Sequence, residues 1–216
     1  MRNIPKSQPP RVLVDSRLEW EAAVGANPSE HNKNRYRHEE IKAALIKETA
    51  SKCVYCESRI GHNCPGDIEH KIPKSERLDL IFDWFNMTIA CNECNRRKRD
   101  YYKETCMFLD PNRDDVEAMT IHIGPIVFST PGNTRSENTL KLLQVDRPDR
   151  RPALIAQKWE KLEAVRNLVE RIASIKEPTL KQCLIAELGE DCQREAEYSA
   201  MIKAYVERLP ANWANQ

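Results

Sequence analysis

Apolar residues recur at helical spacing in the C-terminal third of the chain. Residues 151–178 carry one stripe of large apolar side chains with charged residues opposite it, which is the pattern of an amphipathic helix. Pro178 favours the start of a second helix, predicted over residues 180–188 and ending at Gly189, because glycine readily takes the left-handed conformation that closes a helix. A third helix is predicted over residues 195–209. The stripe of the first helix consists of Ile155, Trp159, Leu162, Val165, Leu168 and Ile172.

The N-terminal part of the chain has a different pattern. Residues 1 to about 17 hold three prolines among polar residues, and proline fixes the backbone and removes a hydrogen-bond donor, so an extended arm is predicted there. Residues 34–50 place Tyr36, Ile41 and Leu45 at helical intervals and predict a helix that leads into Cys53.

Residues 119–132 alternate around a Gly-Pro step and predict two short strands. Together the patterns indicate an α+β protein in three parts. These are an extended arm over residues 1–33, a core over residues 34–125 and a helical region over residues 126–216, whose apolar stripe serves either the core or a subunit interface.

Composition narrows the possible functions. With 216 residues, 40% of them hydrophobic, the chain can bury one good core or two small ones. The formal net charge of +1 gives no chain-wide attraction for nucleic acid, so any such ligand needs local positive charge or a second subunit. The first twenty residues lack the features of a secretory signal, so we expect the chain in the cytoplasm with reduced thiols.

Four of the eight cysteines form two pairs with metal-ligand spacing. Cys53 and Cys56 make one C-x-x-C, and Cys91 and Cys94 make another. Four thiolates complete the tetrahedral shell that zinc prefers and leave no position for a substrate, so a structural zinc is predicted. The alternative is two unrelated pairs of buried cysteines. His62 or Cys64, close to the first pair, could replace one ligand.

The segment between the two pairs contains residues suited to single-metal hydrolysis of a phosphodiester. Glu69 and Asn95 offer oxygen atoms to a hard divalent cation, magnesium or manganese, and His70 offers a neutral imidazole that can take a proton from water. Asn86 would tie the intervening loop to the hairpin. Neighbouring residues of a strand point to opposite faces, so a bulge or the turn at Pro73 must bring residues 69 and 70 to one phosphate.

This arrangement resembles the HNH endonucleases and their ββα-metal fold. The carrying motifs are C-x-x-C, "EHKIP", the asparagine of "DWFNM" and "CNECN" followed by a lysine. The resemblance implies that His70 is the catalytic base, Glu69 the acidic metal ligand, Asn86 the central asparagine and Asn95 the last residue of the triad. Glu69 stands where many members have aspartate, which leaves the preferred metal open.

A narrower resemblance extends over most of the first 115 residues. "MRNIPKSQPP", "CVYCE", "IEHKIPKS" and "FLDPNRDD" look like the retron-associated and Septu-type HNH proteins of bacterial anti-phage defence. That resemblance implies a partner ATPase of the ABC-like class and, in some systems, a reverse transcriptase with its own nucleic acid. The helical region would then be the surface where the partner docks.

Basic residues cluster near the predicted site and could contact phosphates of a nucleic acid. The alternative is a charged face that is merely solvated. Two other functions stay open: a zinc module that binds nucleic acid without cutting it, and an assembly subunit whose helices carry the function. The sequence does not distinguish DNA from RNA. The residues expected at phosphates are Lys71, Lys74, Arg77, Arg96, Arg97, Lys98 and Arg99.

Overall fold

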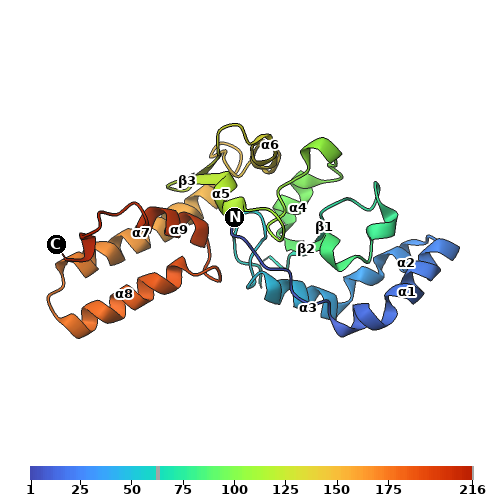
Figure 1. The fold of residues 1–216 in the computed structure, drawn as a ribbon, viewed down its shortest axis with the longest axis horizontal. Coiled ribbons are helices and arrows are strands. Elements are labelled where there is room, and N and C mark those ends of the chain that lie inside the picture. The colour runs from blue at the N-terminus through green and yellow to red at the C-terminus, as the bar shows by residue number, and fades with distance from the viewer. Residues whose placement is uncertain (62–63, 216) are drawn as a thin grey trace. The chain divides into compact units, whose positions relative to one another are not determined.

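The computed structural model describes residues 1–61 and 64–215 (Figure 1). The chain forms two compact units, which are described separately. The first, called the pocket unit, comprises residues 3–55 and 59–114. The second, called the helical unit, comprises residues 115–216 together with residues 1–2 and 56–58.

The pocket unit begins with helices and then forms a small hairpin. Its elements are α1 (Arg11–Ala26), α2 (Glu30–Lys33), α3 (Glu39–Glu48), β1 (Asp67–His70), β2 (Met87–Ala90) and α4 (Asn92–Lys98). Short 3₁₀ segments lie at Asn34–Arg37, Leu78–Leu80, Trp84–Asn86 and Glu104–Cys106. Strands β1 and β2 pair antiparallel, and α4 follows directly, which gives the order ββα (Figure 1).

The hairpin packs on a well-buried apolar core. Ile41 and Leu45 of α3, Phe82, and Met87 and Ile89 of β2 are all fully buried. The helix predicted over residues 34–50 is confirmed as a 3₁₀ turn followed by α3.

The extended arm is shorter than predicted. Only residues 1–10 lack helix and strand, and α1 begins directly after Pro10, whose extended backbone ends the arm. Three residues of α1, Leu13, Trp20 and Val24, are buried at spacings of seven and four, which is one helical face. The prolines therefore mark the start of a helix and do not indicate an arm that continues to residue 33.

The helical unit contains a hairpin and four longer helices. Its elements are α5 (Val116–Met119), β3 (Thr120–Ile123), β4 (Ile126–Ser129), α6 (Thr134–Leu143), α7 (Pro152–Ser174), α8 (Pro178–Cys192), α9 (Ser199–Val206) and a 3₁₀ turn at Trp213–Asn215. The two predicted strands are confirmed, and they pair with each other. The expected boundary at residue 125 passes through the turn that joins them.

The C-terminal helices agree with the pattern, with shifted details. From Ile155 onward the buried positions of α7 are spaced three and four apart. Lys158 is therefore buried in place of the expected Trp159, which is 48% exposed, and Val169 in place of the expected Leu168. Helix α8 continues through Gly189 to Cys192, because a glycine inside a helix costs only about 1 kcal/mol. Helix α9 spans eight residues of the fifteen predicted.

None of the helices in the described residues combines the length and apolar character that crossing a bilayer requires.

Candidate metal centre and active site

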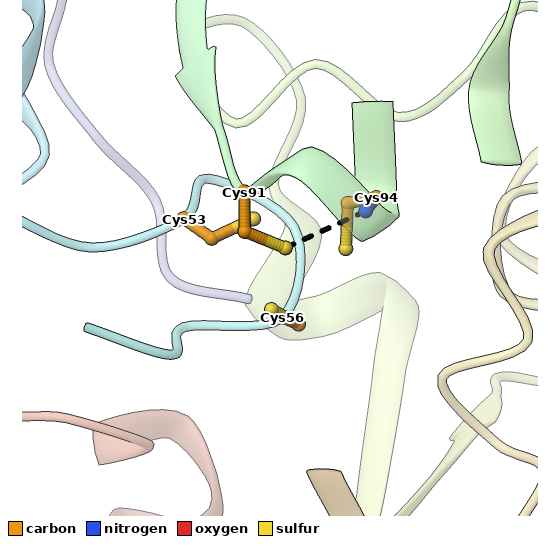
Figure 2. Close-up of side chains that lie close together, drawn as sticks. All are labelled: Cys53, Cys56, Cys91 and Cys94. Carbon is orange, nitrogen blue, oxygen red and sulfur yellow. Dashed lines mark hydrogen bonds between the residues drawn. The ribbon is translucent and has the colours of Figure 1, made fainter. Parts of the chain in front are cut away.

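The four paired cysteines converge on one point. Their sulfur atoms all lie within 4.8 Å of one another and all four residues are buried (Figure 2). Four sulfurs around zinc at about 2.3 Å stand about 3.8 Å apart, so this cluster can hold a zinc ion. Cys64 does not belong to the cluster, and His62 lies outside the described residues.

The cysteine cluster also fixes the start of α4. Cys91 is the N-cap residue of this helix, and its sulfur accepts a hydrogen bond from the backbone N–H of Cys94 at 3.4 Å (Figure 2). The two cysteines are joined to β2 on one side and to Asn95 on the other. A metal bound here would therefore set the position of Asn95 relative to the hairpin.

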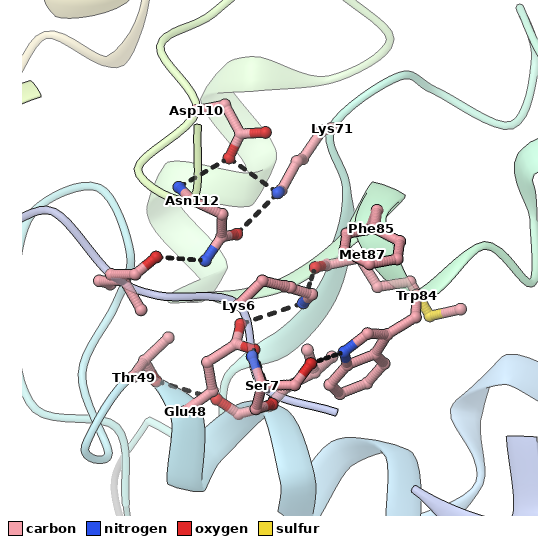
Figure 3. A network of polar contacts seen from close by, with 12 residues as sticks. Lys6, Ser7, Glu48, Thr49, Lys71, Trp84, Phe85, Met87, Asp110 and Asn112 are labelled. Atoms are coloured by element: carbon pink, nitrogen blue, oxygen red, sulfur yellow. Dashed lines mark hydrogen bonds and ion pairs between the residues drawn. The ribbon is translucent and has the colours of Figure 1, made fainter. Parts of the chain in front are cut away.

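A second set of buried polar contacts fixes the hairpin and the arm (Figure 3). Lys6 donates to the Glu48 carboxylate at 3.0 Å and to the carbonyl of Met87 at 2.8 Å. Burial lowers the pKa of Lys6 to about 8. The indole N–H of Trp84 donates to the carbonyl of Ser7 at 2.6 Å. Both ends of β2 are thus held, one by the arm and one by the cysteines.

A pocket of about 600 Å³ lies along β1, and all four residues of this strand line it. The register of β1 and β2 is regular from Asp67 opposite Ala90 to His70 opposite Met87, so the expected bulge is absent from this hairpin. Glu69 and His70 both line the pocket, although they are neighbours on a regular strand. Asn95 lines the same pocket. The three residues that sequence reasoning placed together therefore share one cavity.

His70 is held as a neutral base. Its Nε2 atom lies 2.9 Å from the carbonyl oxygen of Ile81, and because a carbonyl only accepts, Nε2 carries the proton and Nδ1 keeps its lone pair. Burial lowers the pKa of His70 to about 4, against the opposing effect of the Ile81 carbonyl. Its ring meets the Tyr36 ring edge-on, with centroids 4.6 Å apart. The imidazole is thus fixed in orientation and uncharged near neutral pH.

Glu69 is buried in an ion pair. One of its carboxylate oxygens lies 2.5 Å from the ammonium of Lys98, whose side chain is 1% exposed and which also donates to the carbonyl of His70 at 2.9 Å. Burial raises the pKa of Glu69 to about 7, although Lys98 acts to lower it. Lys98 therefore links α4 to the end of β1 and holds one oxygen of Glu69, while the carboxylate keeps a second.

Asp67 is a further oxygen-bearing residue of the pocket, and sequence reasoning missed it. The amide NH₂ of Asn95 donates to the Asp67 carboxylate at 3.3 Å, and both residues line the pocket. This bond fixes the carboxamide plane and leaves the Asn95 oxygen on the other edge. The signal was present in the sequence, since Asp67 precedes Glu69 by two and shares its face of the strand. Two carboxylates and an amide oxygen form a donor set that fits a hard divalent cation.

Asn86 ties the loop to the hairpin as predicted. Its side-chain oxygen accepts from the N–H of Ile72 at 2.8 Å, and its NH₂ donates to the carbonyls of Ile72 at 3.0 Å and Leu80 at 3.3 Å. The Asn86 amide forms its hydrogen bonds with backbone groups, and the residue does not line the pocket. Asn86 is therefore placed to position the loop that carries Ile81, whose carbonyl accepts the hydrogen bond from His70.

The basic residues separate into two groups. Lys71 is paired with Asp110 at 2.7 Å, and Lys98 is the buried partner of Glu69, so these ion pairs do not support the prediction that the two lysines contact phosphates. Arg97 is paired with Glu93 at 2.6 Å and does not line the pocket. Lys74 and Arg96 do line it, although Arg96 is also paired with Glu93. Arg99, the last member of the predicted basic run, lines it as well, whereas Arg77 does not. Arg37 and Lys42, which sequence reasoning did not select, also line it.

Comparisons with known proteins agree with this geometry. Residues 53–100 match the family model described as HNH endonuclease. The chain is 28% identical over 112 residues to Septu protein PtuB of Bacillus thuringiensis, which covers 51% of this chain and 42% of that protein. It is 27% identical over 143 residues to Septu protein PtuB of Bacillus mycoides (strain KBAB4), covering 52% of this chain and 48% of that protein.

The chain thus spans about half the length of the curated relatives that it matches. The matched family segment begins at Cys53 and includes the cysteine cluster, the β1–β2 hairpin and α4. Over residues 53–100 the chain is therefore similar to the HNH endonuclease family, and over about half of its length it resembles the Septu PtuB proteins.

Proposed function

We propose that the chain is a metal-dependent HNH endonuclease that hydrolyses phosphodiester bonds of nucleic acid. One observation supports this proposal above the others: His70 is uncharged, keeps a lone pair on Nδ1, and shares a pocket with the oxygen donors of Glu69, Asn95 and Asp67. A binding module has no need of a base held in this way. The four cysteines would hold a structural zinc next to this pocket.

Each residue has a distinct part in the proposed reaction. Glu69 and Asn95, with Asp67 beside them, would hold a magnesium or manganese ion, which when bound supplies positive charge to the phosphate and the leaving oxygen. His70 takes a proton from the attacking water at Nδ1. The carbonyl of Ile81 orients the imidazole, and Asn86 holds the loop that bears this carbonyl.

Cleavage by a His70 variant tests the proposal directly. The purified chain, alone and mixed with its partner, should cut DNA or RNA when magnesium or manganese is added. His70→Ala should lower the cleavage rate by about 10²–10⁴-fold, the usual contribution of a general base. His31→Ala, an exposed histidine of α2, is the matched control and should cut normally. Unchanged cleavage by His70→Ala, with zinc content and circular dichroism preserved, would remove His70 from its role.

The likeness to the Septu proteins supports a place in anti-phage defence. In this proposal the chain is the effector nuclease of a complex with an ABC-like ATPase of the PtuA type, which docks on the helical unit. Size-exclusion chromatography of the chain mixed with a PtuA-type ATPase should give one larger species. Two separate peaks at micromolar concentration would contradict the proposed assembly.

A further inference from the structure

Tyr36 and two cations form a cluster beside His70. The Tyr36 side chain is 4% exposed and lines the pocket together with Arg37 and Lys74. Its phenolic oxygen accepts hydrogen bonds from the ammonium of Lys74 at 3.0 Å and from Nε of Arg37 at 3.3 Å. The ammonium of Lys74 also lies 4.8 Å from the centre of the Tyr36 ring.

Neither of these two cations is held in an ion pair, although the Asp67 and Glu30 carboxylates act on Arg37 from a longer distance. Within residues 1–61 and 64–215, neither Arg37 nor Lys74 forms an ion pair. The neighbouring basic residues differ, since Lys71 is paired with Asp110 and Lys98 with Glu69. The pocket therefore presents two positive charges next to the catalytic base, in a chain whose net charge is only +1.

The hydrogen bonds of Tyr36 determine what the cluster can bind. A phenolic oxygen has two lone pairs, and both accept hydrogen bonds here, one from Lys74 and one from Arg37. The O–H of Tyr36 is therefore left to donate to a ligand. Lys74 keeps two further N–H donors, and the guanidinium of Arg37 keeps four. A ligand at this place must therefore supply acceptors and negative charge, and a phosphate group supplies both.

We propose that Tyr36, Arg37 and Lys74 form a phosphate clamp that binds a backbone phosphate of the nucleic acid beside His70. The proposal rests on the proposed function for the identity of its ligand, and it adds Tyr36 and Arg37, which lie outside the segment matching the HNH family model. Because the Tyr36 ring also contacts the His70 ring, the clamp places the phosphate next to the atom that activates water.

Tyr36→Phe is the first test, because it removes the hydroxyl and keeps the ring against His70. Binding of short fluorescein-labelled probes, one a DNA duplex and one a single-stranded RNA, is followed by fluorescence anisotropy without added magnesium or manganese, so cleavage does not enter. Losing a hydrogen bond to a charged group should weaken binding about 10-fold. Tyr101→Phe is the matched control, since its hydroxyl donates to the carbonyl of Cys106 outside the pocket, and it should bind normally.

Salt dependence is the second test. Arg37→Gln and Lys74→Gln should each lower the slope of log affinity against log salt by about 0.7–0.9, the value for one lost phosphate contact. Arg77→Gln removes the same charge from the loop of Lys74, but Arg77 is paired with Asp79 and does not line the pocket, so its slope should stay unchanged.

The outcomes separate the clamp from the proposed function. Wild-type affinity in Tyr36→Phe, unchanged slopes in both glutamine variants, or no binding of either probe by the intact chain at low salt would overturn the clamp. If the chain cuts nucleic acid but the salt slopes of Arg37→Gln and Lys74→Gln equal that of the wild type, the clamp is contradicted and the nuclease function is supported. Binding that depends on Tyr36, Arg37 and Lys74 without any metal-dependent cleavage supports the clamp and contradicts the nuclease function.

Discussion

The pocket unit and the helical unit both bury polar side chains, but they hold them differently. Between α7, α8 and α9 the helical unit buries mainly aliphatic residues, such as Leu162 and Ile172 of α7, and its buried His122 has no hydrogen-bond partner at either ring nitrogen within the described chain. The pocket unit also has an apolar core, and its buried Lys98, Glu69 and His70 each have a polar partner. Apolar stripes fix which faces meet, whereas directional polar contacts fix where individual atoms lie, and a catalytic site needs the second kind of control.

Metal removal should produce the largest difference between the units. A four-cysteine zinc site contributes on the order of 10 kcal/mol to folding, as much as a small domain's entire stability. Zinc chelation or Cys91→Ser should therefore abolish amide-exchange protection in β1, β2 and α4, while α7 stays protected. Cys183→Ser, an exposed cysteine of α8, serves as the control. Equal loss of protection in α7 would contradict the separation of the two units.

Lys98→Met should have the next largest effect. It leaves the buried Glu69 carboxylate without its cation, and breaking a buried ion pair in this way costs about 3–5 kcal/mol. Urea unfolding monitored by fluorescence measures the loss. Adding Glu69→Gln should recover part of it, because the second change removes the unpaired charge. A loss below about 1 kcal/mol in the single variant would show that the pair does not stabilise the fold.

Shortening a buried side chain of the helical unit should reduce folding stability without changing nucleic-acid binding at the pocket. Ile172 of α7 is fully buried, so Ile172→Ala should lower the free energy of unfolding by about 2–4 kcal/mol. Trp159→Ala on the same helix removes a larger but half-exposed side chain and should cost less. Thermal unfolding compares the two variants. Binding of the labelled probes should be unchanged in both, and a weakened Ile172→Ala complex would connect α7 to the pocket.

His122 should give the smallest effect, visible as a pH dependence. This buried histidine of β3 has no hydrogen-bond partner at either ring nitrogen within the described chain. Burial, with Met1, Lys158 and Arg208 adding to it and Glu57 opposing, lowers its pKa well below the ordinary value of 6.5. Below pH 6.5 the unfolded chain binds a proton that the folded chain does not, so folding stability should fall as the pH drops.

The expected loss is about 1 kcal/mol between pH 6.5 and 5.5. His122→Leu removes the titrating group and should flatten this part of the stability curve relative to the wild-type chain. Urea unfolding at a series of pH values makes the comparison. Parallel curves for the two proteins would show that His122 does not contribute.

Local features of the sequence were enough to predict several elements. The cysteine pairs indicated the metal cluster, the apolar stripe indicated α7, and alternation around Gly124 and Pro125 indicated β3 and β4. Helix α1 was missed because most of its surface is polar and prolines precede it. Lys98 was assigned to the surface, although it follows Cys94 by four residues and so shares the buried face of α4.

The sequence by itself determined the chemical groups and their local periodicity: two thiolate pairs, an acid next to a histidine, and helices with one apolar face. Only the tertiary structure decided which charges are neutralised and which remain in the pocket. Lys71 and Lys74 are three positions apart, yet one is paired with Asp110 and the other donates to Tyr36, 38 residues away. Electrostatic interaction depends on distance in space and on burial, and neither follows from order along the chain.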